Sequence, residues 1–194
     1  MKSRRQANVE ATRQALIAVA RKHFARHGYA QAEISRIADD ARVTTGAIYH
    51  HFSSKKDLFQ AVAEQLESEI AAAAATVTEA DPWRRLRAAF EILIDVCASP
   101  DVQRITFLEA PQVIGADAWR KIELRYAYGA LRGTLQALID RGVLKPYPID
   151  LLARTLLALL HETSAEVARS RGDPAVRAQI SNLVAGVFNT LAVR

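Results

Sequence analysis

Hydroxyl and imidazole side chains are concentrated between residues 43 and 52, on a segment whose apolar side is reduced to Val43 and Ile48. On a helix these polar groups share the remaining surface, where each can donate or accept a hydrogen bond. The edges of DNA bases expose donors and acceptors of the same kind in the major groove. The segment therefore predicts a helix that contacts DNA through Thr44, Thr45, Tyr49, His50 and His51.

Two helices upstream are expected to position this segment. Apolar residues recur at three- and four-residue spacing from about Val9 to His27, and Gly28 is expected to end that helix in a left-handed conformation. A second helix from about Glu33 to Asp40 is followed by a turn at residues 41–43, after which the helix of residues 44–51 begins. Two short helices joined by a tight turn form a helix-turn-helix, whose second helix enters the major groove.

Basic side chains are unevenly distributed along the chain, which has 194 residues and a formal net charge of +5. Residues 1–60 carry eleven basic and five acidic side chains, whereas residues 61–194 carry fifteen basic and sixteen acidic ones. A basic N-terminal part is typical of a region that binds a polyanion. Its first segment, Met1–Asn8, is expected to be either a solvated basic arm or a further DNA contact.

Helix-capping residues divide the rest of the chain into long helices. Ser54 and Asp57 resemble a capping box, and Asp81-Pro82 and Asp173-Pro174 each place a capping carboxylate before a proline at the first helical position. No strand pattern is present, so we predict an all-α fold of about nine helices. The fourth to ninth expected helices span about 54–75, 82–98, 101–109, 117–141, 149–168 and 174–193.

Apolar periodicity also predicts which sides of these helices are buried. The short sixth helix is expected to turn Val102, Ile105 and Leu108 inward. In the long seventh helix, the apolar residues up to Tyr126 and those from Leu131 onwards lie on nearly opposite faces. The seventh helix is therefore expected to contact two different partners.

Several classes of site and of protein are not expected. Cys97 is the single cysteine, which excludes an intrachain disulfide and a multi-cysteine zinc module. No apolar stretch approaches the roughly 20 residues that span a bilayer, and no signal peptide is visible, so we expect a cytoplasmic protein without metal or cofactor. His161-Glu162 resembles the start of a zincin motif, but Ala165 stands where a second histidine is required, so an enzyme is not expected.

An ordered set of apolar, glycine, aromatic and polar positions runs through the first three expected helices and into the fourth. Its members are Arg13, Leu16, Ile17, Ala20, Phe24, Gly28-Tyr29, Ile37-Ala38, Val43, Gly46, Ile48 to Phe52, Ser54-Lys55 and Leu58-Phe59. This pattern resembles that of the TetR family of bacterial transcriptional regulators. The resemblance implies a helix-turn-helix DNA-binding domain over residues 1–53 and a larger helical domain over residues 54–194 that binds a ligand and forms a dimer.

By this resemblance, the helix of residues 44–51 enters the major groove, and the Lys55 ammonium together with its helix N-terminus holds a phosphate. Two positions depart from the family's pattern. Ala32 replaces the usual N-capping residue of the second helix, and Arg42 replaces a glycine in the turn, at a cost of roughly 1 kcal/mol where φ is positive. The implied DNA-contacting residues are Arg36, Arg42, Thr44, Thr45, Gly46, Ala47, Tyr49, His50, His51 and Lys55.

The resemblance also implies a small-molecule pocket among the fourth to eighth helices, where aromatic side chains with a few polar tips suit an apolar ligand. His161 lies on the alanine-rich side of the eighth helix, so contact with another helix is an alternative to ligand contact. The eighth and ninth helices are expected to pack against a second copy as a four-helix bundle, or else to close the monomer's own core. The candidate ligand contacts are Phe90, Ile94, Cys97, Phe107, Trp119, Tyr126 and His161.

These residues and the resemblance together predict a homodimeric, ligand-responsive repressor that binds a near-palindromic operator in double-stranded DNA and is released by a small molecule. Its two recognition helices are expected about one DNA turn, ~34–36 Å, apart. The alternative is a ligand-independent DNA-binding or architectural protein with the same N-terminal domain. The sequence leaves open the operator, the effector, and whether transcription is repressed or activated.

Overall fold

Helices form nearly all the secondary structure of residues 4–193, which the computed structural model describes, together with one isolated β-bridge between Leu144 and Ala192. The expected all-α fold is confirmed. Met1–Ser3, the start of the expected basic arm, lie outside the described residues. The elements are α1 (Arg4–Gln31), α2 (Ile34–Asp40), α3 (Thr45–His51), α4 (Lys55–Ala75), α5 (Pro82–Cys97), η1 (Val102–Glu109), α6 (Ala110–Ile114), α7 (Ala116–Glu123), η2 (Leu124–Tyr128), α8 (Gly129–Asp140), α9 (Ile149–Arg169) and α10 (Pro174–Leu191).

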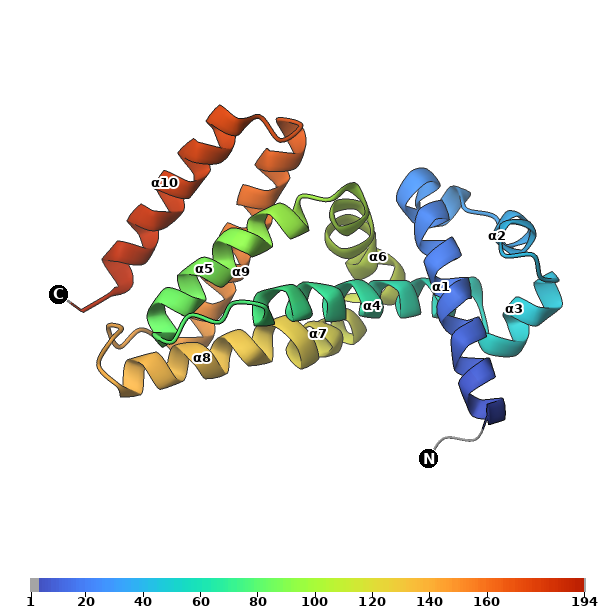
Figure 1. Ribbon diagram of the computed structural model, residues 1–194, viewed down its shortest axis with the longest axis horizontal. Helices are drawn as coiled ribbons and strands as arrows, with labels where there is room; N and C mark the ends of the chain where they lie inside the picture. Colours follow the sequence, from blue (N-terminus) through green and yellow to red (C-terminus); the bar gives the residue numbers. More distant parts are fainter. Residues whose placement is uncertain (1–3, 194) are drawn as a thin grey trace.

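The first three helices form a separate group at one end of the molecule, and α4 runs from this group into the larger bundle (Figure 1). Helix α1 begins at Arg4, earlier than expected, and is broken at Gly28, whose φ of 74° and ψ of 168° are not helical. The φ of Gly28 is positive as expected, but its ψ lies outside the left-handed helical region predicted for a C-cap. Helices α2 and α3 follow as a helix-turn-helix, joined by a turn in which Arg42 has a φ of 56°.

Aromatic rings fix the start of α4 against α1. The Phe59 ring centroid lies 5.1 Å from that of Phe24 and 5.2 Å from that of Tyr29, both in edge-to-face geometry that favours ring contact. Leu58 and Phe59 are fully buried in this cluster, whereas Ile70, further along α4, is buried in the larger bundle. One rigid helix therefore contributes to the cores of both parts of the molecule.

The capping residues act as the sequence predicted. The Ser54 hydroxyl accepts a hydrogen bond from the Asp57 amide at 3.1 Å, and the Asp81 and Asp173 carboxylates each accept one at 2.8 Å from the first turn of α5 and of α10. Helix α2 lacks such a cap: its N-cap residue is Glu33, with no side-chain hydrogen bond to the helix, and Ala32 is buried. The expected missing cap is confirmed.

The prediction that Leu108 points inward is wrong, because η1 is a π-helix. Val102 and Ile105 are buried as expected, but Leu108 is 59% exposed. Hydrogen bonds from residue i to i+5 widen each turn of a π-helix, so a buried side recurs at longer spacing than in an α-helix. The buried residues of this stretch are Val102, Ile105, Thr106 and Ala110, whereas Leu108 faces away from them.

A second π-helix explains the change of face in the expected seventh helix. That helix is divided into α7, η2 and α8, and the short stretch of η2 shifts the angular phase of the residues that follow it. Trp119 and Ile122 before the shift, and Leu135 and Leu138 after it, are all buried. Both predicted faces are therefore in the core, on either side of the π-turn.

Helix α10 covers one side of the bundle through aromatic contacts with α5. The Phe188 ring centroid lies 5.1 Å from that of Phe90 and 5.4 Å from that of Trp83. The Arg177 side chain, at the start of α10, forms ion pairs with Asp95 at 2.6 Å and Glu91 at 3.0 Å on α5. Among the described residues, no helix is long and apolar enough to cross a membrane.

Replacing Arg42 with glycine is expected to stabilise the fold by about 1 kcal/mol, because glycine adopts a positive φ without a Cβ penalty. The variant Arg42→Ala removes the same charge and keeps the Cβ, so it is the matched control and should show no gain. Urea unfolding of both variants measures the difference. Equal stabilities of the glycine and alanine variants would show that Arg42 is not strained.

Candidate nucleic-acid interface and internal pocket

Helix α3 presents its polar side to solvent at the end of the molecule furthest from α10 (Figure 1). Ile48 is buried and holds the helix to the N-terminal core, while Tyr49 is 53% exposed and His50 is exposed beside it. The Thr44 hydroxyl accepts a hydrogen bond from the Ala47 amide at 3.1 Å and so caps the helix. Thr45 and Gly46 are exposed at the same end, which leaves the N-terminus of α3 open for contact.

Basic side chains beside α3 differ in their freedom to reach a phosphate. Arg42 is exposed in the turn, and the Arg36 side chain is 71% exposed, with only a 3.3 Å pair to Glu33. Lys55 is held instead: its ammonium donates to the Ala30 carbonyl at 3.2 Å, and burial lowers its pKa. The Lys55 group therefore stabilises the broken end of α1 in this structure, a role that the sequence did not indicate.

The ten predicted DNA-contacting residues lie together on the turn, on α3 and on the helix ends beside it. Seven of them are exposed, namely Arg36, Arg42, Thr44, Thr45, Gly46, Tyr49 and His50, and the other three, Ala47, His51 and Lys55, are half-buried. With polar neutral groups on the helix and cations at its margins, the arrangement can donate and accept at base edges and neutralise phosphates.

Polar contacts join the N-terminal helices to η1 in the larger bundle. The Glu109 carboxylate accepts the Tyr29 amide at 2.8 Å, and the Arg104 guanidinium donates to the Arg26 carbonyl at 3.3 Å. Arg21, on α1, donates to the Asp101 carboxylate just before η1 and to the Glu69 carboxylate on α4, each at 2.6 Å. Polar contacts from both η1 and α4 therefore reach α1.

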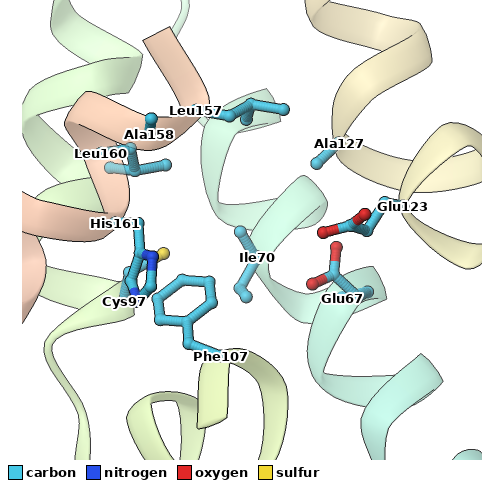
Figure 2. Close-up of a pocket in the computed structure, with 10 residues that line it drawn as sticks. All are labelled: Glu67, Ile70, Cys97, Phe107, Glu123, Ala127, Leu157, Ala158, Leu160 and His161. Carbon is cyan, nitrogen blue, oxygen red and sulfur yellow. The ribbon is translucent and has the colours of Figure 1, made fainter. Parts of the chain in front are cut away.

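A cavity of about 210 Å³ lies inside the larger bundle, between α4, α5, η1, α7, η2 and α9. Figure 2 shows two carboxyl groups, those of Glu67 and Glu123, facing one another on one side, and Phe107, Cys97 and His161 on the other. The Phe107 and His161 ring centroids are 4.5 Å apart. The lining residues are Glu67, Ile70, Cys97, Phe107, Glu123, Ala127, Leu157, Ala158, Leu160 and His161.

Burial strongly affects the acidic groups of this cavity. Glu67 is 4% exposed, and burial together with the nearby Glu123 charge raises its pKa to about 7. Burial also raises the pKa of Glu123, opposed by a hydrogen bond from Trp119 and by the Arg120 charge. The Cys97 thiol, whose pKa rises to about 12 on burial, stays protonated and unreactive at neutral pH.

Three of the seven predicted ligand contacts, Cys97, Phe107 and His161, line the cavity. Phe90, Ile94, Trp119 and Tyr126 are not among its lining residues: Phe90 packs on Phe188, and Ile94 and Trp119 are buried in the core. The sequence analysis missed Glu67 and Glu123. A signal for Glu67 was available, since it follows Ala63 by four residues and precedes Ile70 by three, on the buried side of α4.

The cavity residues do not form a metal site in the described part of the chain, where no group of three or more histidine, cysteine, aspartate or glutamate side chains is placed to hold an ion.

Comparison with known proteins identifies both parts of the chain. Residues 16–62 match the family described as bacterial regulatory proteins, tetR family, and residues 83–191 match the tetracyclin repressor-like C-terminal domain. The Transposon Tn10 TetC protein of Escherichia coli is 34% identical over 156 residues, which cover 80% of this chain and 79% of that protein. The transcriptional repressor BepR of Brucella suis is 32% identical over 107 residues, 54% of this chain and 51% of BepR.

Solved structures share the fold along the whole chain. A TetR-family transcriptional regulator from Pectobacterium atrosepticum has a TM-score of 0.76 and 29% identity, with 100% of this chain and 99% of that chain covered. Three findings indicate the same family: the two family matches, the similarity to TetC and the exposed helix-turn-helix. The chain therefore belongs to the TetR family and is a DNA-binding transcriptional regulator.

Proposed function

We propose that this protein is a homodimeric repressor that binds a near-palindromic operator and is released by a small molecule in the cavity of the larger bundle. The observation that carries the proposal is the solvent-exposed polar face of α3, at the end of the molecule away from that cavity. Repression rather than activation is supported by BepR, which is named a transcriptional repressor. Operator binding places the protein with chromosomal DNA in the cytoplasm.

In this proposal, residues 1–53 bind DNA and residues 54–194 bind the effector and form the dimer. Thr45, Gly46 and Tyr49 on the exposed side of α3 read base edges, where hydroxyls and a close backbone approach are suited to the major groove. Arg36 and Arg42, beside α3, neutralise phosphates. Lys55 holds the start of α4 to the end of α1 by its hydrogen bond to the Ala30 carbonyl. No catalytic role is proposed.

The proposed dimer interface combines α9 and α10. Leu183 on α10 is 60% exposed and Leu151 on α9 is 57% exposed, although both helices bury their opposite sides in the monomer. Ala158 and His161 on α9 are also exposed, and small side chains allow close packing of two helices. Two such pairs of helices would form a four-helix bundle, which relates the two α3 helices by twofold symmetry.

Effector control is proposed to operate through α4 and η1, since both line the cavity and both contact α1. Glu67 and Ile70 belong to α4, and Phe107 belongs to η1, two residues before the Glu109 carboxylate that holds the Tyr29 amide. A ligand that fits one position of these helices better than another shifts the population between two spacings of the α3 helices. The alternative is a ligand-independent DNA-binding protein, in which the cavity has no regulatory role.

Selection of a bound sequence from random double-stranded DNA, followed by footprinting, tests the proposal. We expect protection of a short inverted repeat, and its loss on addition of effector. Sequence-indifferent coating of DNA would instead support the architectural alternative.

The variant Leu183→Glu is expected to give a monomer, because a charge would be buried at the proposed interface. Its affinity for the inverted repeat should fall by roughly 100-fold, since each half-site would then be bound separately. Sedimentation velocity and gel-shift titration measure the two effects. The matched control is Leu124→Glu, which changes a side chain of similar exposure, 47%, on η2 outside α9 and α10. A dimeric Leu183→Glu protein would refute this interface.

A further inference from the structure

The cavity contains two acidic side chains, Glu67 and Glu123, and Glu67 has no basic partner in the described part of the chain. The Glu67 carboxyl group forms no hydrogen bond or ion pair with any described residue, although only 4% of the residue is exposed. Figure 2 shows this group directed into the cavity towards Glu123. The ten lining residues include no lysine or arginine. Among the described residues, Arg120 is the cation whose charge acts on Glu123, and Glu67 has no such partner.

An unpaired carboxylate is costly to bury, because the charged form loses its hydration. The fold tolerates Glu67 by keeping a proton on it near neutral pH, as its raised pKa of about 7 indicates. A bound cation would replace that proton and supply the missing partner. A bound anion would face two acids of like charge, which disfavours it.

The other walls suit the apolar body of a cationic ligand. Ile70, Leu157 and Leu160 provide aliphatic surface, and the Phe107 ring offers a face that attracts positive charge. The cavity volume of about 210 Å³ lies below the ~300–1,000 Å³ typical of pockets for drug-sized ligands. The space therefore selects a compact molecule.

We propose that the effector is a compact organic cation, a quaternary or protonated amine with an apolar body, held between the Glu67 and Glu123 carboxylates and the Phe107 ring. The proposal rests on the proposed function, in which this cavity receives the effector. It adds the charge and the chemical class of the ligand, and it assigns Glu67 and Glu123 as the residues that determine specificity.

The titratable groups that face the site come from four elements: Glu67 from α4, Cys97 from α5, Glu123 from α7 and His161 from α9. Cys97 stays neutral because its pKa is raised to about 12. Glu67, with a pKa of about 7, ionises as the pH rises and then attracts a cation. This predicts tighter cation binding as the pH rises from 6 to 8.

Calorimetric titration of the full chain with three probes of similar shape tests the proposal. The probes are phenyltrimethylammonium, which carries a permanent charge, its uncharged isostere tert-butylbenzene, and the anion benzenesulfonate. We expect the cation to bind at least roughly tenfold more tightly than the isostere, and the anion not to bind. Because the probe itself does not titrate, its affinity should rise by roughly tenfold between pH 6 and 8, as Glu67 ionises.

The variants Glu67→Gln and Glu123→Gln should each weaken binding of the cation by roughly tenfold or more while leaving the affinity for tert-butylbenzene unchanged. The matched control is Glu64→Gln on the same helix, whose carboxylate accepts a hydrogen bond from Gln60 at 2.9 Å and does not line the cavity. Circular dichroism checks that each variant is folded.

Equal binding of the cation and its isostere, preferential binding of benzenesulfonate, absence of binding by all three probes, or an unaffected Glu67→Gln variant would overturn the inference. None of these results involves DNA, so each is distinct from failure of the proposed function, which the operator experiment detects. Release of the operator by phenyltrimethylammonium in the wild type, but not in Glu67→Gln, would support both the cationic effector and the proposed repressor function.

Discussion

Replacing Gly28 with alanine is expected to lower the free energy of unfolding by about 2–4 kcal/mol. The φ of 74° and ψ of 168° at Gly28 lie in a region that only glycine adopts readily. A Cβ there would lie 2.5 Å from the Glu109 carboxylate oxygen Oε1. That carboxylate cannot move without loosening its 2.8 Å hydrogen bond from the Tyr29 amide.

Urea unfolding of Gly28→Ala measures the loss, and Gly133→Ala is the matched control. Gly133 lies within α8, where an added Cβ would meet nothing within 4 Å, so alanine should stabilise the helix by about 0.5–1 kcal/mol. In the background Glu109→Ala, the Gly28→Ala change should cost only its backbone strain, because the close contact is gone. A loss below about 1 kcal/mol in the wild type would contradict the strain argument.

The same glycine shows which parts of the fold could be predicted from sequence. Its positive φ, and the capping by Ser54, Asp81 and Asp173, were predicted because each depends on neighbouring residues only. The contact between Gly28 and Glu109 was not, since it joins residues 81 positions apart whose approach depends on how η1 packs.

Both π-helices limited the sequence analysis in a similar way. The assumption of 3.6 residues per turn placed Leu108 inside, whereas the wider turn of η1 leaves it exposed. In the segment that became α7, η2 and α8, the reversal of apolar faces was recognised, but its cause was not. A periodic pattern predicts a buried side only while the hydrogen-bond register is constant.

The candidate sites were predictable to different degrees for a related reason. The residues proposed to contact DNA are close together in the sequence, so their common surface follows from one helix and its turn. The cavity collects side chains from six elements, and acidic residues on a helix are usually solvated. Aromatic character was enough to predict Phe107 and His161, whereas Glu67 and Glu123 become significant only once α4 packs against α7.

The stability of the protein is expected to fall as the pH rises from about 4.5 to above 7, because of Glu67. Its pKa is about 7 in the folded protein and 4.5 in the reference state, so between these values the unfolded chain loses a proton that the native state keeps. The stabilisation from that retained proton is complete below pH 4.5 and is lost as the pH passes through 7. A difference of this size corresponds to about 3–4 kcal/mol at high pH.

The variant Glu67→Gln removes this dependence, since glutamine has no proton to lose. We expect its free energy of unfolding to lie within about 1 kcal/mol of the wild type at pH 5 and to exceed it by about 3–4 kcal/mol at pH 8.5, measured by urea denaturation. For Glu64→Gln, the difference in free energy of unfolding from the wild type should not change with pH, because Glu64 is hydrogen-bonded outside the cavity. If Glu67→Gln changed the free energy of unfolding by the same amount at both pH values, the substitution would act through packing. A gain in stability that occurs only at high pH would instead show that the buried charge of ionised Glu67 destabilises the wild type. A cationic ligand would neutralise that same charge.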